Sequence, residues 1–251
     1  MKKFLSLIML TALMFTGLQL SAQSQVYLNL SGAIPTGDFA DGDNNDWGLV
    51  YDDTEGGAGF GFNAGLKIKI ATGVNGLWGM ITLDGIYNGL NSDLREHFED
   101  YIDSNESLYS DFSLKTPKYI NIPLMGGVNY TYNFNPKFGL FAEAGLGANL
   151  RVITTGEEFR ETTTINNIKK ETFTNEYDPK VSFAFQLGGG IELSKRFTIG
   201  IDYYNLGTAK VKGKESHKVK NTNGGSNSYS DKFSLKRITP TIVMLRIGFK
   251  L

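Results

Sequence analysis

The segment from Phe60 to Ile70 alternates strictly between apolar side chains and small or polar ones, and this alternation is the strongest constraint on the fold. Phenylalanine, alanine, leucine and isoleucine occupy the even positions, whereas glycine, asparagine and lysine occupy the odd ones. Because successive residues of a β-strand point to opposite faces, this segment predicts a strand with one apolar and one polar face. Such a strand separates two different environments.

The same two-residue period recurs in seven further segments. They are, approximately, residues 26–34, 77–89, 119–132, 138–151, 181–193, 197–204 and 243–251. No charged residue falls on the apolar face of any of these strands. Eight such strands are enough to close a sheet into a barrel. We therefore expect an all-β fold, an eight-stranded antiparallel up-and-down barrel.

The N-terminus predicts export from the cytoplasm. Two lysines follow Met1, an apolar run extends from Phe4 to Leu18, and a small-residue cleavage site ends at Ala22. We expect residues 1–22 to be a cleaved signal peptide and residues 23–251 to form one barrel domain. The chain contains no cysteine, which excludes disulfides, thiolate metal sites and lipid attachment at a cysteine. Its net charge of −1 argues against a nucleic-acid partner.

Short and long connections alternate between the predicted strands. The connections at Asn75-Gly76, 133–137 and 194–196 have the length of hairpin turns. Four others, at 36–57, 90–117, 153–180 and 208–236, have roughly twenty to thirty residues each, far more than is usual in a compact domain. An even strand number places both termini at the short-turn end. This is the pattern of transmembrane barrels with short periplasmic turns and four long extracellular loops.

Alternation alone fits two kinds of barrel. In a secreted lipocalin-like barrel the apolar face lines a ligand cavity, whereas in a membrane barrel it faces lipid. Aromatic residues on the apolar face gather near the short-turn end, as expected of a belt at a membrane interface. They are Tyr130, Tyr132, Phe138, Phe197 and Phe249. We therefore expect a bacterial outer-membrane protein, with outer-membrane lipid as its first partner.

Four segments carry a resemblance to a known family. They are Lys118-Tyr-Ile-Asn-Ile-Pro-Leu124, Phe141-Ala-Glu-Ala-Gly-Leu-Gly147, Leu187-Gly-Gly-Gly-Ile-Glu-Leu193 and Phe197 to Gly207. Over the whole mature chain, the sequence resembles the small eight-stranded outer-membrane barrels of the OmpX and PorT-like kind, the porin-family outer-membrane β-barrel domains. The usual terminal aromatic of that family is replaced by Leu251, with Phe249 two residues earlier. The resemblance implies an integral outer-membrane protein and brings no catalytic residues with it.

The polar faces of the strands predict a lumen filled by charged side chains. If Asn75-Gly76 forms a two-residue type I′ turn, Lys67 lies opposite Asp84 and Lys69 opposite Thr82, which predicts an ion pair between Lys67 and Asp84. A barrel of eight strands is just wide enough for side chains to fill it. We expect a plug made by a charge network of seven residues: Lys67, Lys69, Asp84, Glu143, Arg151, Asp202 and Arg246.

Charge is distributed unevenly among the long loops. The first, residues 37–57, has seven carboxylates and no base, whereas the last, residues 208–236, has seven lysines and two acids. Barrel closure makes these loops neighbours, so they can partly neutralise each other. Alternatively, a basic patch in the last loop binds anionic lipopolysaccharide or an extracellular partner. The residues of this patch are Lys210, Lys212, Lys214, Lys218 and Lys220.

The acidic first loop also contains a weak calcium motif. Asp41, Asp43, Asn45 and Asp52 resemble the start of a calcium-binding loop, but Asp46 stands where that motif needs glycine. A solvated acidic loop is the alternative interpretation.

Three functions remain open from the sequence. The favoured one is a structural or surface-interaction role through the charged loops; the alternatives are a narrow porin or transporter and a lipid-modifying surface enzyme. An enzyme would have to use His97 or His217, and both lie deep in long connections, where catalytic geometry is hard to hold. We therefore do not expect catalysis. We expect no cofactor either, because Gly188-Gly-Gly190 lies within a strand and does not open a phosphate-binding helix.

Overall fold

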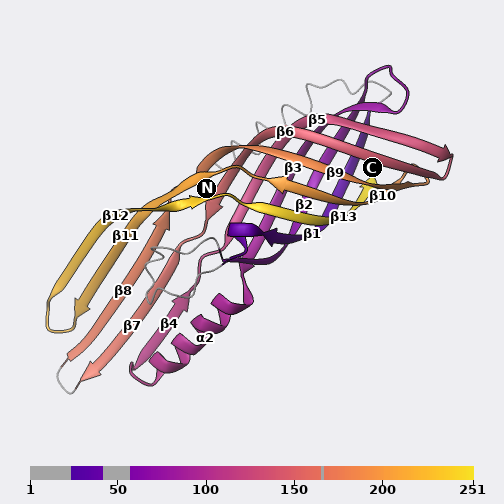
Figure 1. The fold of residues 1–251 in the computed structure, drawn as a ribbon. Helices are drawn as coiled ribbons and strands as arrows, with labels where there is room; N and C mark the ends of the chain where they lie inside the picture. Colours follow the sequence, from indigo (N-terminus) through magenta and orange to yellow (C-terminus); the bar gives the residue numbers. More distant parts are fainter. Residues whose placement is uncertain (1–23, 42–56, 165–166) are drawn as a thin grey trace.

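The computed structural model describes residues 24–41, 57–164 and 167–251, so the predicted signal peptide lies outside the described residues. Eight strands form the barrel: β1 (Gln25–Thr36), β2 (Ala58–Ala71), β3 (Leu77–Leu90), β5 (Tyr119–Asn135), β6 (Phe138–Ile153), β9 (Lys180–Leu193), β10 (Phe197–Asn205) and β13 (Thr241–Lys250). Their order, β1-β13-β10-β9-β6-β5-β3-β2, is closed because β1 pairs antiparallel with both β13 and β2 (Figure 1). The predicted fold class is confirmed. Within the described residues, no helix is long and apolar enough to cross a membrane.

The two faces of the strands separate as the sequence predicts. Phe60 and Phe183 point outward and are 71% and 65% exposed, whereas Lys67 points into the barrel and is 3% exposed. Ile68 shares the outward parity of Phe60 but is buried. Outward aromatic residues gather at the short-turn end, where the rings of Phe197 and Phe249 lie 5.4 Å apart. The outer wall of the barrel is therefore apolar with an aromatic rim.

The predicted register between β2 and β3 is wrong by two residues. Asp84 lies opposite Gly65, and Lys67 lies opposite Thr82, so Lys67 and Asp84 are not cross-strand partners. The reason lies in the turn, because Thr72 Oγ1 donates a hydrogen bond to the carbonyl of Leu77 (2.8 Å) and extends the loop. Asn75 does not have the positive φ that a type I′ turn requires. A shift of two residues leaves every side chain on its predicted face.

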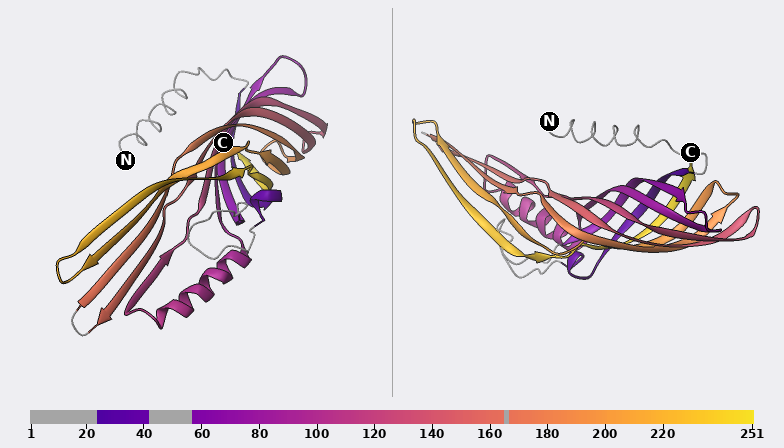
Figure 2. Two further views of the ribbon diagram at one scale, coloured as in Figure 1. Left: turned by 60° about the vertical axis from the view of Figure 1, so that its left-hand side comes forward. Right: turned by 90° about the horizontal axis from the view of Figure 1, so that it is seen from above.

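The described parts of the long connections contain regular structure where we expected loops. Beyond the barrel, β4 (Asp111–Lys115), β7 (Gly156–Thr164), β8 (Asn167–Tyr177), β11 (Ala209–Asn221) and β12 (Ser226–Ile238) form a second sheet, the outer sheet, in the order β12-β11-β8-β7-β4. Each of these strands continues a barrel strand after a short break, and the order matches β13-β10-β9-β6-β5. The outer sheet therefore extends one wall of the barrel, and helix α2 (Ser92–Glu106) lies on one of its faces beside β4 (Figures 1 and 2).

An apolar layer fills the barrel where it meets the outer sheet. The short 3-10 helix η1 (Gly37–Phe39) turns inward after β1, and the Phe39 ring contacts the edge of the Tyr119 ring at a centroid distance of 5.2 Å. Other members of this layer come from the outer ends of the barrel strands and from the start of the outer sheet: Ala33, Ile86, Ala184, Leu206, Val211, Ile238, Ile242 and Met244. The sequence did not predict this layer, which closes the outer mouth of the barrel.

Candidate functional site

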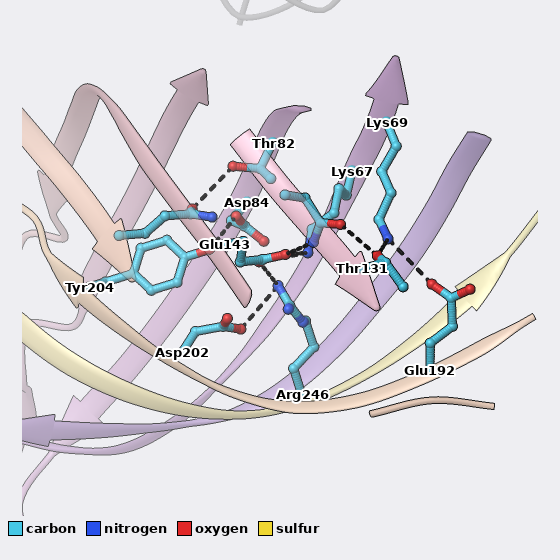
Figure 3. Close-up of polar contacts among 12 residues, drawn as sticks. Lys67, Lys69, Thr82, Asp84, Thr131, Glu143, Glu192, Asp202, Tyr204 and Arg246 are labelled. Atoms are coloured by element: carbon cyan, nitrogen blue, oxygen red, sulfur yellow. Dashed lines mark hydrogen bonds and ion pairs between the residues drawn. The ribbon is translucent and has the colours of Figure 1, made fainter. Parts of the chain in front are cut away.

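Glu143 on β6 is the centre of the polar network in the lumen. Its carboxylate accepts hydrogen bonds from Lys67 Nζ on β2 (2.6 and 2.7 Å), Arg246 Nη1 on β13 (2.8 Å) and Asn129 Nδ2 on β5 (2.8 Å). The same Arg246 nitrogen lies 3.0 Å from Asp202 Oδ2 on β10. Figure 3 shows the side chains of Lys67, Glu143, Asp202 and Arg246 converging inside the barrel. One carboxylate thus connects four strands across the lumen.

Lys69 forms a second branch of the network, toward the short-turn end. Its Nζ lies 3.4 Å from Glu192 Oε2 on β9 and 3.5 Å from Thr131 Oγ1 on β5 (Figure 3). It also lies over the ring of Tyr27 on β1, 5.1 Å from the centroid. Glu192 and Tyr27 lie on the predicted polar faces of their strands, but neither belongs to the predicted network of seven residues.

Asp84 has uncharged hydrogen-bond partners in place of the predicted lysine. It accepts bonds from Asn63 Nδ2 and the Tyr204 hydroxyl, each at 3.0 Å. The position opposite Asp84 is Gly65, and a Cβ there would collide with the Asp84 carboxylate. Gly188 makes the same space for Asp202. Glycine on the lumen face therefore lets the acidic side chains lie flat across the neighbouring strand.

Phe141 is an aromatic residue in the middle of this charged lumen. Its ring lies 5.8 Å from Lys67 Nζ, 5.8 Å from Lys69 Nζ and 5.6 Å from the Arg246 guanidinium carbon. Three cations therefore surround one ring, a favourable arrangement away from water. Phe141 shares the parity of Glu143, and that signal could have placed it in the lumen from the sequence.

Arg151, predicted to belong to the network, lies apart from it. It is eight residues from Glu143 on the same strand, roughly 25 Å at strand spacing. Its guanidinium donates hydrogen bonds to the carbonyls of Gly207 (3.0 Å) and Ile238 (3.2 Å). Both carbonyls lie where a barrel strand gives way to the outer sheet. Arg151 therefore joins the outer sheet to the barrel.

The outer sheet has an inner face, continuous with the apolar layer, and an outward face. On the inner face Arg160 forms an ion pair with the buried Glu158, donates to the Tyr101 hydroxyl of α2 (2.9 Å) and lies over the Phe173 ring at 4.9 Å. Burial raises the pKa of Tyr101. These contacts attach α2 to the sheet.

Both histidines lie in regular structure and not in loops. His97 lies in α2, and His217 lies on the inner face of β11, stacked on Phe173 with a centroid distance of 4.1 Å. His217 Nε2 is 3.3 Å from Glu171 Oε1. The adjacent Ser216 points to the opposite face of the strand, so it does not form a nucleophile pair with His217.

The five lysines of the predicted basic patch share the outward face of the outer sheet. They occupy alternate positions of β11 and are all exposed, whereas Val211 between them is 5% exposed and belongs to the apolar layer. Lys232 on β12 lies opposite Lys214 and adds a sixth positive charge. The structure therefore brings these residues together on one surface.

Of the calcium candidates only Asp41 belongs to the described residues; Asp43, Asn45 and Asp52 lie outside them. Across the described part of the chain, no group of three or more histidines and carboxylates has a geometry suited to a metal ion.

Among solved structures, the chain is similar to a major outer membrane protein from Thermus thermophilus (11% identity, TM-score 0.45, covering 91% of this chain and 100% of that one). It is also similar to OprG from Pseudomonas aeruginosa (10% identity, TM-score 0.39, covering 91% of this chain and 95% of that one). A third similar structure is Ail from Yersinia pestis, solved with the heparin analogue sucrose octasulfate (8% identity, TM-score 0.36, covering 91% of this chain and 97% of that one).

No curated protein sequence matches the chain. A family model described as the outer membrane protein beta-barrel domain matches residues 5–232. That family indicates the bacterial outer membrane. This chain belongs to the outer membrane protein beta-barrel domain family.

Proposed function

We propose that the protein is a closed barrel that anchors the outer sheet in the outer membrane, and that its role at the cell surface is structural or interactive. The observation that supports this most strongly is the Glu143 network. The gap that Lys67, Phe141 and Glu143 border is too small to hold a water molecule. The apolar layer at the outer mouth adds a second closure, because ions do not cross a dry apolar constriction readily.

Planar-bilayer recording of the purified full-length protein tests this proposal. The wild-type protein is expected to give no stable conductance. A variant with Lys67→Ser, Phe141→Ala and Glu143→Ser, combined with Phe39→Ala in the apolar layer, is expected to give small conductance steps and serves as the positive control. Large, stable steps from the wild-type protein would instead support the alternative of a narrow porin.

The surface role requires the outer sheet to lie outside the cell. Protease added to intact cells is expected to cleave the β7–β8 and β11–β12 hairpins while the barrel strands survive. A matched sample of lysed cells shows whether the short turns at the other end become accessible only after lysis. Cleavage of the short turns in intact cells would contradict the proposed orientation.

We also propose that residues 1–22 are removed during export. Mass spectrometry of the protein from outer-membrane fractions is expected to show a mature chain that begins at Gln23. A full-length chain beginning at Met1 in those fractions would contradict this.

A further inference from the structure

The outward lysines begin directly above the apolar wall of the barrel. On β9, Val181 is 70% exposed and Phe183 is 65% exposed, and Tyr203 on β10 also points outward. Asp178, directly after β8, donates its backbone N–H to the carbonyl of Lys212 (2.9 Å) and is three residues from Val181, roughly 10 Å of strand. The outward face therefore changes from apolar to basic over about the thickness of a lipid headgroup layer.

The lysines closest to the barrel line a groove. Lys210, Lys212, Lys214 and Lys232 surround a volume of about 730 Å³, with Glu176 and Asp178 at its border. Four positive and two negative charges leave a net charge of +2. No ion pair joins any of these four lysines to an acid of the described residues, so their charges are available to an external anion.

The second pair of lysines on the same strand provides an internal comparison. Lys218 and Lys220 have the same spacing and the same outward direction as Lys212 and Lys214, but they lie farther along the hairpin. Six residues separate equivalent members of the two pairs, roughly 20 Å of strand. A ligand fixed in the membrane surface reaches the nearer pair first, whereas a soluble polyanion has access to both pairs.

From this geometry we propose that the groove formed by Lys210, Lys212, Lys214 and Lys232 binds the phosphorylated headgroup of an outer-leaflet lipid. Lysine ammonium groups are compact point charges suited to phosphate, and basic clusters next to the membrane surface attract anionic headgroups. The inference deepens the proposed surface role by assigning its partner. Lipid binding in the groove does not depend on a closed lumen. Stable conductance would therefore contradict the closed lumen and leave the lipid-binding proposal standing.

The test is a binding titration of the full-length protein in neutral detergent, with thermophoresis as the readout. The ligands are lipid A in its bisphosphorylated and dephosphorylated forms. The double variant Lys212→Gln with Lys214→Gln is expected to lower the affinity for bisphosphorylated lipid A about 30-fold. Each lysine near a membrane surface contributes about 5-fold, and the two factors multiply. The matched control, Lys218→Gln with Lys220→Gln, removes the same charge from the same strand and is expected to change binding less than about 3-fold. Lys212→Arg with Lys214→Arg retains the charge and is expected to retain binding.

Two results would overturn the proposal. One is equal loss of binding in the two glutamine pairs, and the other is equal affinity for lipid A with and without phosphates. Inositol hexaphosphate provides the lipid-free source of phosphate. If it binds as tightly as lipid A and is weakened equally by both glutamine pairs, the outward face is a site for soluble polyanions and not for a membrane headgroup. Unchanged heat-dependent gel mobility confirms that each variant is folded.

Discussion

Replacing Glu143 with glutamine tests whether the lumen network stabilises the barrel. The substitution preserves size but removes the carboxylate that Lys67 and Arg246 share. Arg246 keeps Asp202 at 3.0 Å, whereas Lys67 loses its only acid within 4 Å among the described residues. Removing one partner of a buried ion pair costs about 3–5 kcal/mol. Because one of the two cations remains paired, we expect a loss of about 3 kcal/mol in the free energy of unfolding.

A double-mutant cycle separates the ion pair from general disturbance of the lumen. Lys67→Met alone is expected to cost about 1–2 kcal/mol, because Glu143 keeps Arg246 and Asn129. The double variant is expected to recover at least about 1.5 kcal/mol relative to the sum of the single losses. The assay is urea unfolding in zwitterionic vesicles, with tryptophan fluorescence and gel mobility as the two readouts.

Glu192→Gln is the matched control for this experiment. It removes a buried carboxylate from the same lumen, but that carboxylate has one lysine partner at the longer distance of 3.4 Å. Its expected cost is about 1 kcal/mol. Equal losses for the Glu143 and Glu192 substitutions, or additivity within about 0.5 kcal/mol in the cycle, would refute the view that Glu143 is the centre of the network.

Three further predictions concern other parts of the fold. Gly188→Ala places a methyl group against the Asp202 carboxylate and is expected to lower the free energy of unfolding by about 1–3 kcal/mol, whereas Gly126→Ala, with open space at its Cβ, is expected to be neutral in the same urea assay. Burial alone would raise the pKa of Glu171, but Lys169 and His217 hold this pKa below the ordinary 4.5. The ionised Glu171 therefore stabilises the outer sheet above about pH 4.5, and this stabilisation is lost as the pH falls through the folded pKa. Faster amide exchange in β8 and β11 at low pH would reveal the loss. Arg160→Ala leaves a buried carboxylate unpaired and releases α2, so amide exchange in that helix is expected to accelerate, and unchanged exchange would contradict the attachment described above.

The eight barrel strands were predictable because their two faces meet different environments. Every outward residue had to suit an apolar environment and every inward one a crowded polar lumen, so parity alone placed Phe60 and Lys67 correctly. Parity cannot detect a shift of two residues, however, and the turn between β2 and β3, where Thr72 bonds to Leu77, is longer than the predicted two-residue turn. The predicted pair of Lys67 and Asp84 failed for this reason.

Contacts across the lumen could not be predicted from the strands one by one. Lys67 and Glu143 are 76 residues apart in sequence and lie on strands that are not neighbours, so their meeting depends on how the whole barrel closes. Phe141 was not predicted because the expected network consisted of charged residues alone.

The outer sheet was missed for a different reason. Its strands contain few of the large apolar side chains by which strands are usually recognised. In β11, lysines instead occupy alternate positions from Lys210 to Lys214 and again at Lys218 and Lys220. The alternation of lysine was itself a period-two signal. The apolar layer at the outer mouth was missed because its members come from many separate segments of the sequence.

The continuity of the barrel wall with the outer sheet has a consequence for how this surface can diversify. Because side chains alternate along a strand, adding two residues to each arm of the β11–β12 hairpin lengthens the projection by roughly 7 Å without turning any existing side chain to the other face. The tip can therefore be lengthened or shortened in such steps while the membrane-embedded part keeps its sequence. Surface reach and barrel stability can then change independently of each other.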